Sequence, residues 1–302
     1  MKKRFLRRLG LFFFAACFLL GSLTVPAYGM YNPPFEIQAQ SAIVVDLSSG
    51  EVVYELNADA PVQPAMLTGM MTTILTLESG MDLDNTTGTM KQYIQDTLYQ
   101  SGAYLGGFLL NEEASLRKLC YAVMLQSACD AAMMIADTVG DGSQAYFVEQ
   151  MNKKAQEIGA QNTTFTTAYG RVEEGSTTTA RDMASIAQYA MEVPGFLEIA
   201  GTASYDGGPT NQHETLYWNS QNSLLVPGHQ YYYQGVTGLK SSFDTDAGRS
   251  LVATCSSGGV SYLVVLMGVP AYDDNGERLE ENLAFTQAAD LFDWLYSTFK
   301  IK

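Results

Sequence analysis

Polar side chains that stand among β-favouring residues in the last third of the chain are the first candidates for chemistry. Lys240 is followed directly by two hydroxyl residues, Ser241 and Ser242. An ammonium group beside hydroxyl groups is suited to hold a carboxylate through charge-assisted hydrogen bonds. The alternative is a lysine that stays on its strand and is neutralised by a nearby acid, because the chain carries 32 Asp and Glu residues against 17 Lys and Arg.

Ser127 and Cys129 form a second group of candidates, two residues apart. A cysteine nucleophile needs a base and an electropositive pocket. The chain has only two histidines, His213 and His229, and both stand in segments predicted as loops. With no neighbouring cysteine they also make a poor metal site. The sequence therefore predicts no metal, no cofactor and no thiol chemistry.

The elements that must position these residues follow from hydrophobic spacing. Residues 41–45 and 52–56 predict a β-hairpin, and the stripe of Met66, Met70 and Ile74 predicts a buried helix over 66–79. Further helices are predicted around 116–124 and over 130–139, 144–158, 177–191 and 282–299, and strands over 251–255 and 262–267. This order predicts an α/β (α+β) domain over 30–302, in which an antiparallel sheet is flanked by helices and an all-helical lobe is inserted.

The first 29 residues read as a secretory signal, with a basic start, an apolar run and a small-residue cleavage site before Met30. The protein is therefore expected to be secreted or extracytoplasmic, and membrane-anchored only if this segment stays uncleaved. Without its five basic residues the net charge of −15 becomes −20, which disfavours nucleic acid as a partner.

Three cysteines remain after the signal: Cys120, Cys129 and Cys255. On one continuous helix Cys120 and Cys129 would point to opposite sides, so they are not expected to pair. Three buried thiols are predicted, and a bridge to Cys255 stays open in an oxidising compartment.

The order of elements, together with local motifs, resembles the serine D-alanyl-D-alanine carboxypeptidases among the penicillin-binding proteins. The likeness covers nearly all of residues 38–299. It rests on the following segments: Ala42-Ile43-Val44-Val45-Asp46, Pro64-Ala65, Ser127-Ala128-Cys129-Asp130, Phe147-Val148-Glu149-Gln150-Met151-Asn152, Thr179-Ala180-Arg181-Asp182-Met183, Gly235-Val236-Thr237-Gly238-Leu239-Lys240 and Ala247-Gly248-Arg249. The resemblance implies a β-lactamase/DD-peptidase fold.

That family uses a Ser-x-x-Lys motif at a helix N-terminus, in which the lysine activates the serine for attack on the peptide carbonyl. At the matching positions this chain has Met66 and Gly69. A thioether has no proton to lose and cannot form an acyl-enzyme. Loss of the nucleophile alone lowers turnover by about 10⁶ in a related kind of site, so the family reaction by the family route is predicted to be absent.

The other two motifs survive in part. The second keeps Ser127 but has Cys129 where the family has Asn, and the third keeps Lys240 and reads Ser241 and Ser242 where the family has Thr and Gly. The resemblance makes Ser127, Lys240, Ser241 and Ser242 the substrate-binding candidates. The side chain of Ser242 is expected to fit poorly at a position where the family has none.

The sequence thus predicts an exported, non-catalytic relative of the carboxypeptidases, which binds a peptidoglycan stem peptide or a cell-wall synthesis protein. One alternative is an active serine-type carboxypeptidase with an unorthodox nucleophile, such as Ser127 aided by Lys240. Another is a protein-interaction module whose cleft is plugged by Met66 and Ser242.

Overall fold

The computed structural model describes residues 31–99 and 101–299. The predicted signal peptide over 1–29 lies outside the described residues. At the centre of the described chain is a five-stranded antiparallel sheet with the strand order β2-β1-β9-β8-β7. Its strands are β1 (Ser41–Asp46), β2 (Val52–Leu56), β7 (Val236–Asp244), β8 (Gly248–Ser257) and β9 (Val260–Val269).

This sheet joins the beginning of the described chain to its end, because β1 pairs with β9 in a register that sets Ile43 opposite Val265. The turn between β8 and β9 contains Gly258 and Gly259, both with positive φ, a conformation that glycine adopts without steric strain. The predicted antiparallel sheet and its opening hairpin are confirmed.

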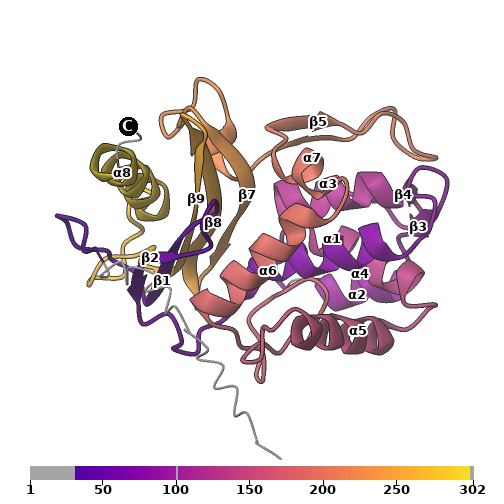
Figure 1. The fold of residues 1–302 in the computed structure, drawn as a ribbon. Helices are drawn as coiled ribbons and strands as arrows, with labels where there is room; N and C mark the ends of the chain where they lie inside the picture. The colour runs from indigo at the N-terminus through magenta and orange to yellow at the C-terminus, as the bar shows by residue number, and fades with distance from the viewer. Residues whose placement is uncertain (1–30, 100, 300–302) are drawn as a thin grey trace, which may run out of the picture.

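Helices cover both faces of the sheet (Figure 1). Helix α8 (Leu283–Thr298) lies on one face and contacts β8 and β9, while α6 (Ala180–Glu192) contacts β1 and β9. Beyond α6 lies the predicted helical lobe. Its elements are η1 (Ala65–Thr68), α1 (Gly69–Glu78), α2 (Gln92–Leu98), α3 (Leu116–Gln126), α4 (Cys129–Val139), α5 (Gln144–Glu157) and α7 (Phe196–Ala200).

Two small hairpins and one turn complete the described structure: β3 (Thr87–Thr89) with β4 (Glu113–Ser115), β5 (Ser204–Asp206) with β6 (Tyr217–Asn219), and the 3₁₀ turn η2 (Ser223–Leu225). Side-chain caps define several helix starts. The side chains of Ser115, Ser143, Thr179 and Asn282 accept a hydrogen bond from a backbone N–H in the first turn of α3, α5, α6 and α8. Among the described residues no helix has both the length and the apolar character needed to span a bilayer.

The predicted helix over 66–79 begins as the 3₁₀ turn η1 and continues as α1, with all three stripe residues, Met66, Met70 and Ile74, at most 3% exposed. Ser127 ends α3 in the left-handed conformation, with φ of 56°. Because α3 ends at Ser127, Cys120 lies on α3 and Cys129 on α4. All three cysteines are free and buried, which confirms the predicted thiols.

Candidate active site

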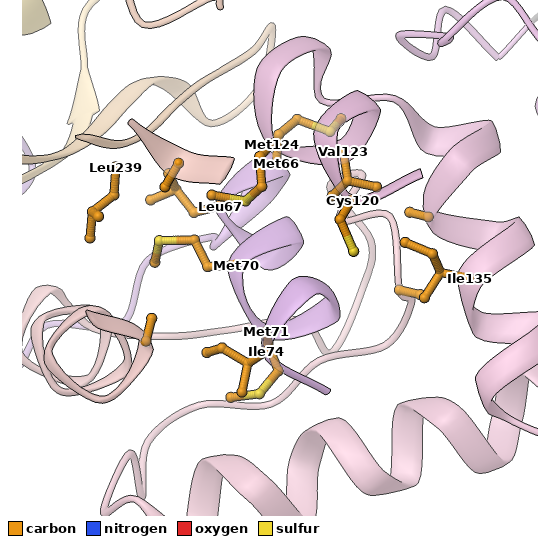
Figure 2. Close-up of a cluster of buried hydrophobic side chains, with 14 of the residues drawn as sticks. Met66, Leu67, Met70, Met71, Ile74, Cys120, Val123, Met124, Ile135 and Leu239 are labelled. Carbon is orange, nitrogen blue, oxygen red and sulfur yellow. The ribbon is translucent and has the colours of Figure 1, made fainter. Parts of the chain in front are cut away.

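The head of the central helix is occupied by the apolar side chain of Met66 (Figure 2). Met66 is 3% exposed and belongs to the buried cluster that also contains Val123 and Leu239. The next hydroxyl along the helix, on Thr68, is 1% exposed, and its Oγ1 has no hydrogen-bond partner among the described residues. Neither residue therefore combines a nucleophilic atom with a base.

The backbone N–H of Met66 is already hydrogen-bonded. It donates to Oγ of Ser242 over 3.1 Å, and Ser242 is 5% exposed. An N–H group at the start of a helix is the kind of donor that stabilises the negative oxygen formed in acyl transfer. Here the hydroxyl oxygen of Ser242 already accepts the hydrogen bond from this N–H. Ser242 was expected to fit poorly, but its side chain is accommodated because this hydrogen bond gives its oxygen a partner.

Lys240 points from β7 into the helical lobe and is 1% exposed. Its Nζ donates to the backbone carbonyls of Val123 at 2.9 Å and Met124 at 3.3 Å, and to Oγ of Ser127 at 3.0 Å. Both carbonyls belong to the last turn of α3, where the helix itself offers them no partner. The ammonium group therefore uses its three N–H donors to cap α3.

Burial lowers the pKa of Lys240 to about 7, because the charged form is removed from water. No carboxylate lies within ion-pairing distance of its ammonium group among the residues that the structure describes. The structure brings Lys240 and Ser127 together, as the resemblance implies, whereas Ser242 two residues later contacts Met66 instead.

Gly69 provides the space that Lys240 fills. A Cβ atom built on Gly69 would lie 2.8 Å from Cγ1 of Val123 and 3.1 Å from Cε of Lys240. Real Cβ atoms do not approach other carbons this closely without a shift of the surroundings. A longer side chain at position 69 would therefore compete with the buried stem of Lys240 for the same volume.

Cys129 lies at the start of α4 and is fully buried. Burial raises the pKa of its thiol to about 12, and its Sγ lies 3.7 Å from the carbonyl oxygen of Ser127. A thiol that keeps its proton is a poor nucleophile. In this environment the thiol of Cys129 lacks the lowered pKa that a catalytic cysteine needs.

A small cavity of about 130 Å³ lies beside the C-terminal part of β7. Its lining includes Ser241 and Ser242 together with two arginines, Arg249 and Arg278. Arg249 is 5% exposed and donates to the carbonyls of Leu279 and Glu281. Burial, and then repulsion by Arg278, lower the pKa of Arg249.

These two guanidinium groups carry no ion pair within the described ranges. In such an acidic chain, two neighbouring arginines without a carboxylate make a small site suited to an anion. Arg249 entered the sequence argument only as part of a matching segment, and Arg278 was missed because it stands in an acidic loop with no recognisable motif. Its position beside Arg249 is set by tertiary structure.

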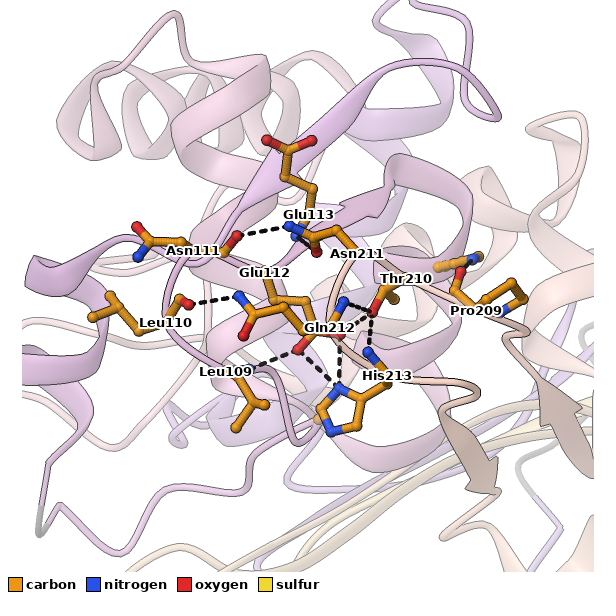
Figure 3. A network of polar contacts seen from close by, with 12 residues as sticks. Leu109, Leu110, Asn111, Glu112, Glu113, Pro209, Thr210, Asn211, Gln212 and His213 are labelled. Atoms are coloured by element: carbon orange, nitrogen blue, oxygen red, sulfur yellow. Dashed lines mark hydrogen bonds and ion pairs between the residues drawn. The ribbon is translucent and has the colours of Figure 1, made fainter.

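Two other features lie away from this site. Figure 3 shows Glu112, which is fully buried and binds the N–H of Leu109, Oγ1 of Thr210 and Nδ1 of His213. Burial raises the pKa of Glu112, but these hydrogen bonds outweigh it and hold the pKa below its ordinary value. His213 thus joins its loop to a buried carboxylate.

The second feature is a cavity of about 710 Å³ between the end of α1 and α5. No predicted site residue lines it.

Comparison with known proteins agrees with this geometry. Residues 29–271 match the family described as D-alanyl-D-alanine carboxypeptidase. The chain belongs to this family. The resemblance drawn from sequence motifs is therefore confirmed, and so is the fold, since the Streptomyces K15 DD-transpeptidase superposes with a TM-score of 0.78 over 88% of this chain and 100% of that chain at 24% identity.

Two further family members are longer than this chain, which covers less than two thirds of each. The carboxypeptidase DacF of Bacillus subtilis is 27% identical over 82% of this chain, which covers 62% of DacF. DacA of Escherichia coli K12 is 31% identical over 77% of this chain, which covers 57% of DacA. A D-alanyl-D-alanine carboxypeptidase from Mycobacterium tuberculosis superposes with a TM-score of 0.75 at 27% identity, over 89% of this chain and 94% of that chain.

Proposed function

We propose that this member of the carboxypeptidase family is an exported, non-catalytic protein of peptidoglycan metabolism. It binds the carboxylate end of a wall peptide without cleaving it. Export rests on the basic and apolar pattern of residues 1–29. Fractionation of cells that produce the full chain tests this part, and recovery of the whole pool in the cytoplasm would contradict it.

The observation that carries the proposal is the head of the central helix. Met66 has no hydroxyl, its N–H is bonded to Ser242, and Lys240 is held by the end of α3. Each group that acyl transfer from the head of this helix would need is therefore absent or engaged with the protein itself. Binding, in contrast, needs only the cavity with Ser241, Arg249 and Arg278 beside the C-terminal part of β7.

A fluorescent penicillin tests the absence of acylation. The purified protein is incubated with the label at pH 7.5, denatured and examined by gel fluorescence and intact mass, with DacA of Escherichia coli as the positive control. No covalent adduct is expected. A stoichiometric adduct would refute the non-catalytic assignment.

Titration with an N-acylated D-alanyl-D-alanine dipeptide tests binding. We expect saturable binding that is lost when the carboxylate is amidated and weakened about tenfold or more in Arg278→Gln, because charge-assisted hydrogen bonds to a carboxylate contribute about 1.5–3 kcal/mol. The matched control Lys153→Gln removes one positive charge on α5, where the side chain is 68% exposed, and should bind as the unaltered protein does. No saturable binding would favour a protein partner with the cleft plugged.

One observation favours a second candidate function. Ser127 Oγ lies 3.0 Å from Lys240 Nζ, whose pKa of about 7 would let it act as a base. In that reaction Oγ bonds to the peptide carbonyl, its proton passes to Nζ and then to the departing amine of D-alanine, and water later releases the acyl group. Ser127 is only 5% exposed. A penicillin adduct mapped to Ser127 and absent in Ser127→Ala would establish this candidate.

A further inference from the structure

A short hairpin over 271–281 carries Arg278 to the rim of the small cavity. Tyr272 and Arg278 form a β-bridge, and the N–H of Leu279 donates to the carbonyl of Ala271 over 3.0 Å. The side chain of Arg278 therefore projects from a hydrogen-bonded turn, even though the residue itself is exposed. These hydrogen bonds fix the backbone from which the guanidinium of Arg278 extends.

Two neighbouring residues of the sheet hold this hairpin. Arg249 on β8 donates to the carbonyl of Leu279 over 3.0 Å and to that of Glu281 over 2.5 Å. Phe243 on β7 stands directly opposite Arg249 in the ladder. Its ring lies 5.1 Å from the central guanidinium carbon of Arg278, within the range of a cation–π interaction.

This contact differs from an ion pair in one important respect. A carboxylate partner would use the N–H donors of Arg278 and neutralise its charge, whereas the face of an aromatic ring does neither. No acid pairs with Arg278 among the residues described. The edge of its guanidinium group thus keeps donors for an anion that enters the cavity from solvent.

We propose that Phe243 is a positioning residue, which holds the guanidinium of Arg278 at the rim of the cavity so that its N–H groups bind the ligand carboxylate. Arg249 then serves to clamp the hairpin, and Arg278 makes the contact with the ligand. This division of roles rests on the proposed function, since it names the groups by which the same cavity would recognise its ligand.

The position of the guanidinium is tested without any ligand. In proton–nitrogen NMR spectra, the Nε–H resonance of Arg278 (assigned by its loss in Arg278→Lys) should be shifted upfield by the ring current of Phe243. Phe243→Leu keeps an apolar side chain but removes the ring, and should abolish the shift. Phe243→Tyr restores a ring and should retain it. An unchanged resonance in Phe243→Leu overturns the proposal.

Binding of the N-acylated D-alanyl-D-alanine dipeptide tests the consequence. Phe243→Leu should bind about two- to fivefold more weakly, the size of an exposed cation–π contact, and Phe243→Tyr should bind as the unaltered protein does. If the Arg278 resonance moves in Phe243→Leu but this variant binds the dipeptide with unchanged affinity, the positioning role of Phe243 is overturned while the proposed function stands. No binding by the unaltered protein overturns the proposed function instead, and the resonance still decides whether the ring holds Arg278.

Discussion

Replacement of Lys240 by methionine should change how the stability of the protein depends on pH. Methionine has a similar length but no charge, so it removes the ammonium and leaves the carbonyls of Val123 and Met124 without their donor. In the folded protein Lys240 loses its proton near pH 7, whereas an unfolded lysine keeps it to about pH 10.4. Between these pH values the unfolded chain binds one proton more at this site, so the free energy of unfolding rises with pH.

The size of this effect follows from the two pKa values. The free energy of unfolding should rise by up to about 1.4 kcal/mol per pH unit, and by about 1.5 kcal/mol between pH 7 and 8.5. Below pH 6 the contribution is flat, because lysine is charged in both states. Other groups titrate in this range, including the cysteine thiols of the unfolded chain, and subtraction of the Lys240→Met values from those of the unaltered protein removes their contribution.

Urea unfolding followed by circular dichroism at pH 5.5, 7 and 8.5, in a reducing buffer, measures the difference. We expect the unaltered protein to gain about 1.5 kcal/mol over Lys240→Met between the two higher pH values. Lys153→Met is the control, since its side chain is 68% exposed and no such gain is expected. A difference that stays constant from pH 5.5 to 8.5 would refute the reasoning, because it would mean that the carbonyls of α3 keep Lys240 charged despite its burial.

Three further outcomes follow from the same site. Gly69→Ala should destabilise the protein by about 1–3 kcal/mol in urea unfolding, because the added Cβ would lie 2.8 Å from Cγ1 of Val123; a gain in stability, as the helix propensity of alanine alone predicts, would contradict this. Met66→Ser should lower the free energy of unfolding by about 2–5 kcal/mol and still give no penicillin adduct, since the backbone N–H of residue 66 stays bonded to Ser242. Penicillin labelling of this single variant would show that this N–H is free to stabilise an acyl-transfer oxygen. Iodoacetamide at pH 8 should alkylate Cys129 in urea but not in the folded protein, because burial raises its pKa to about 12, and rapid alkylation of the folded protein followed by peptide mass spectrometry would disprove it.

Much of the architecture was predictable because its signals are local. The stripe of Met66, Met70 and Ile74 repeats with the period of a helix, and all three residues are at most 3% exposed in the structure. Thr179, which is in the matching segment at the start of α6, caps that helix with its side chain. The antiparallel sheet followed from β-favouring runs at both ends of the chain and from the family resemblance.

The roles of the candidate site residues were harder to predict. Lys240 was expected either to bind a carboxylate or to be paired with an acid, but its ammonium lies against the end of α3. There it contacts Ser127, which is 113 residues earlier in the chain. The arginines of the cavity carried no motif that would have singled them out. Each of these contacts joins residues far apart in sequence, so the spacing of neighbours carries no information about them.

The amino-acid sequence by itself determined what is chemically impossible here: a thioether at position 66 and a hydrogen at position 69 cannot supply a nucleophile and a base, whatever surrounds them. Only the tertiary structure decided where the remaining polar groups are used. The packing of β7 against η1 brings Ser242 to the N–H of Met66, and the side chain of Lys240 reaches from the same strand to the carbonyls of Val123 and Met124. Buried donors and acceptors must find partners, and which partners are within reach depends on the packing of the two lobes.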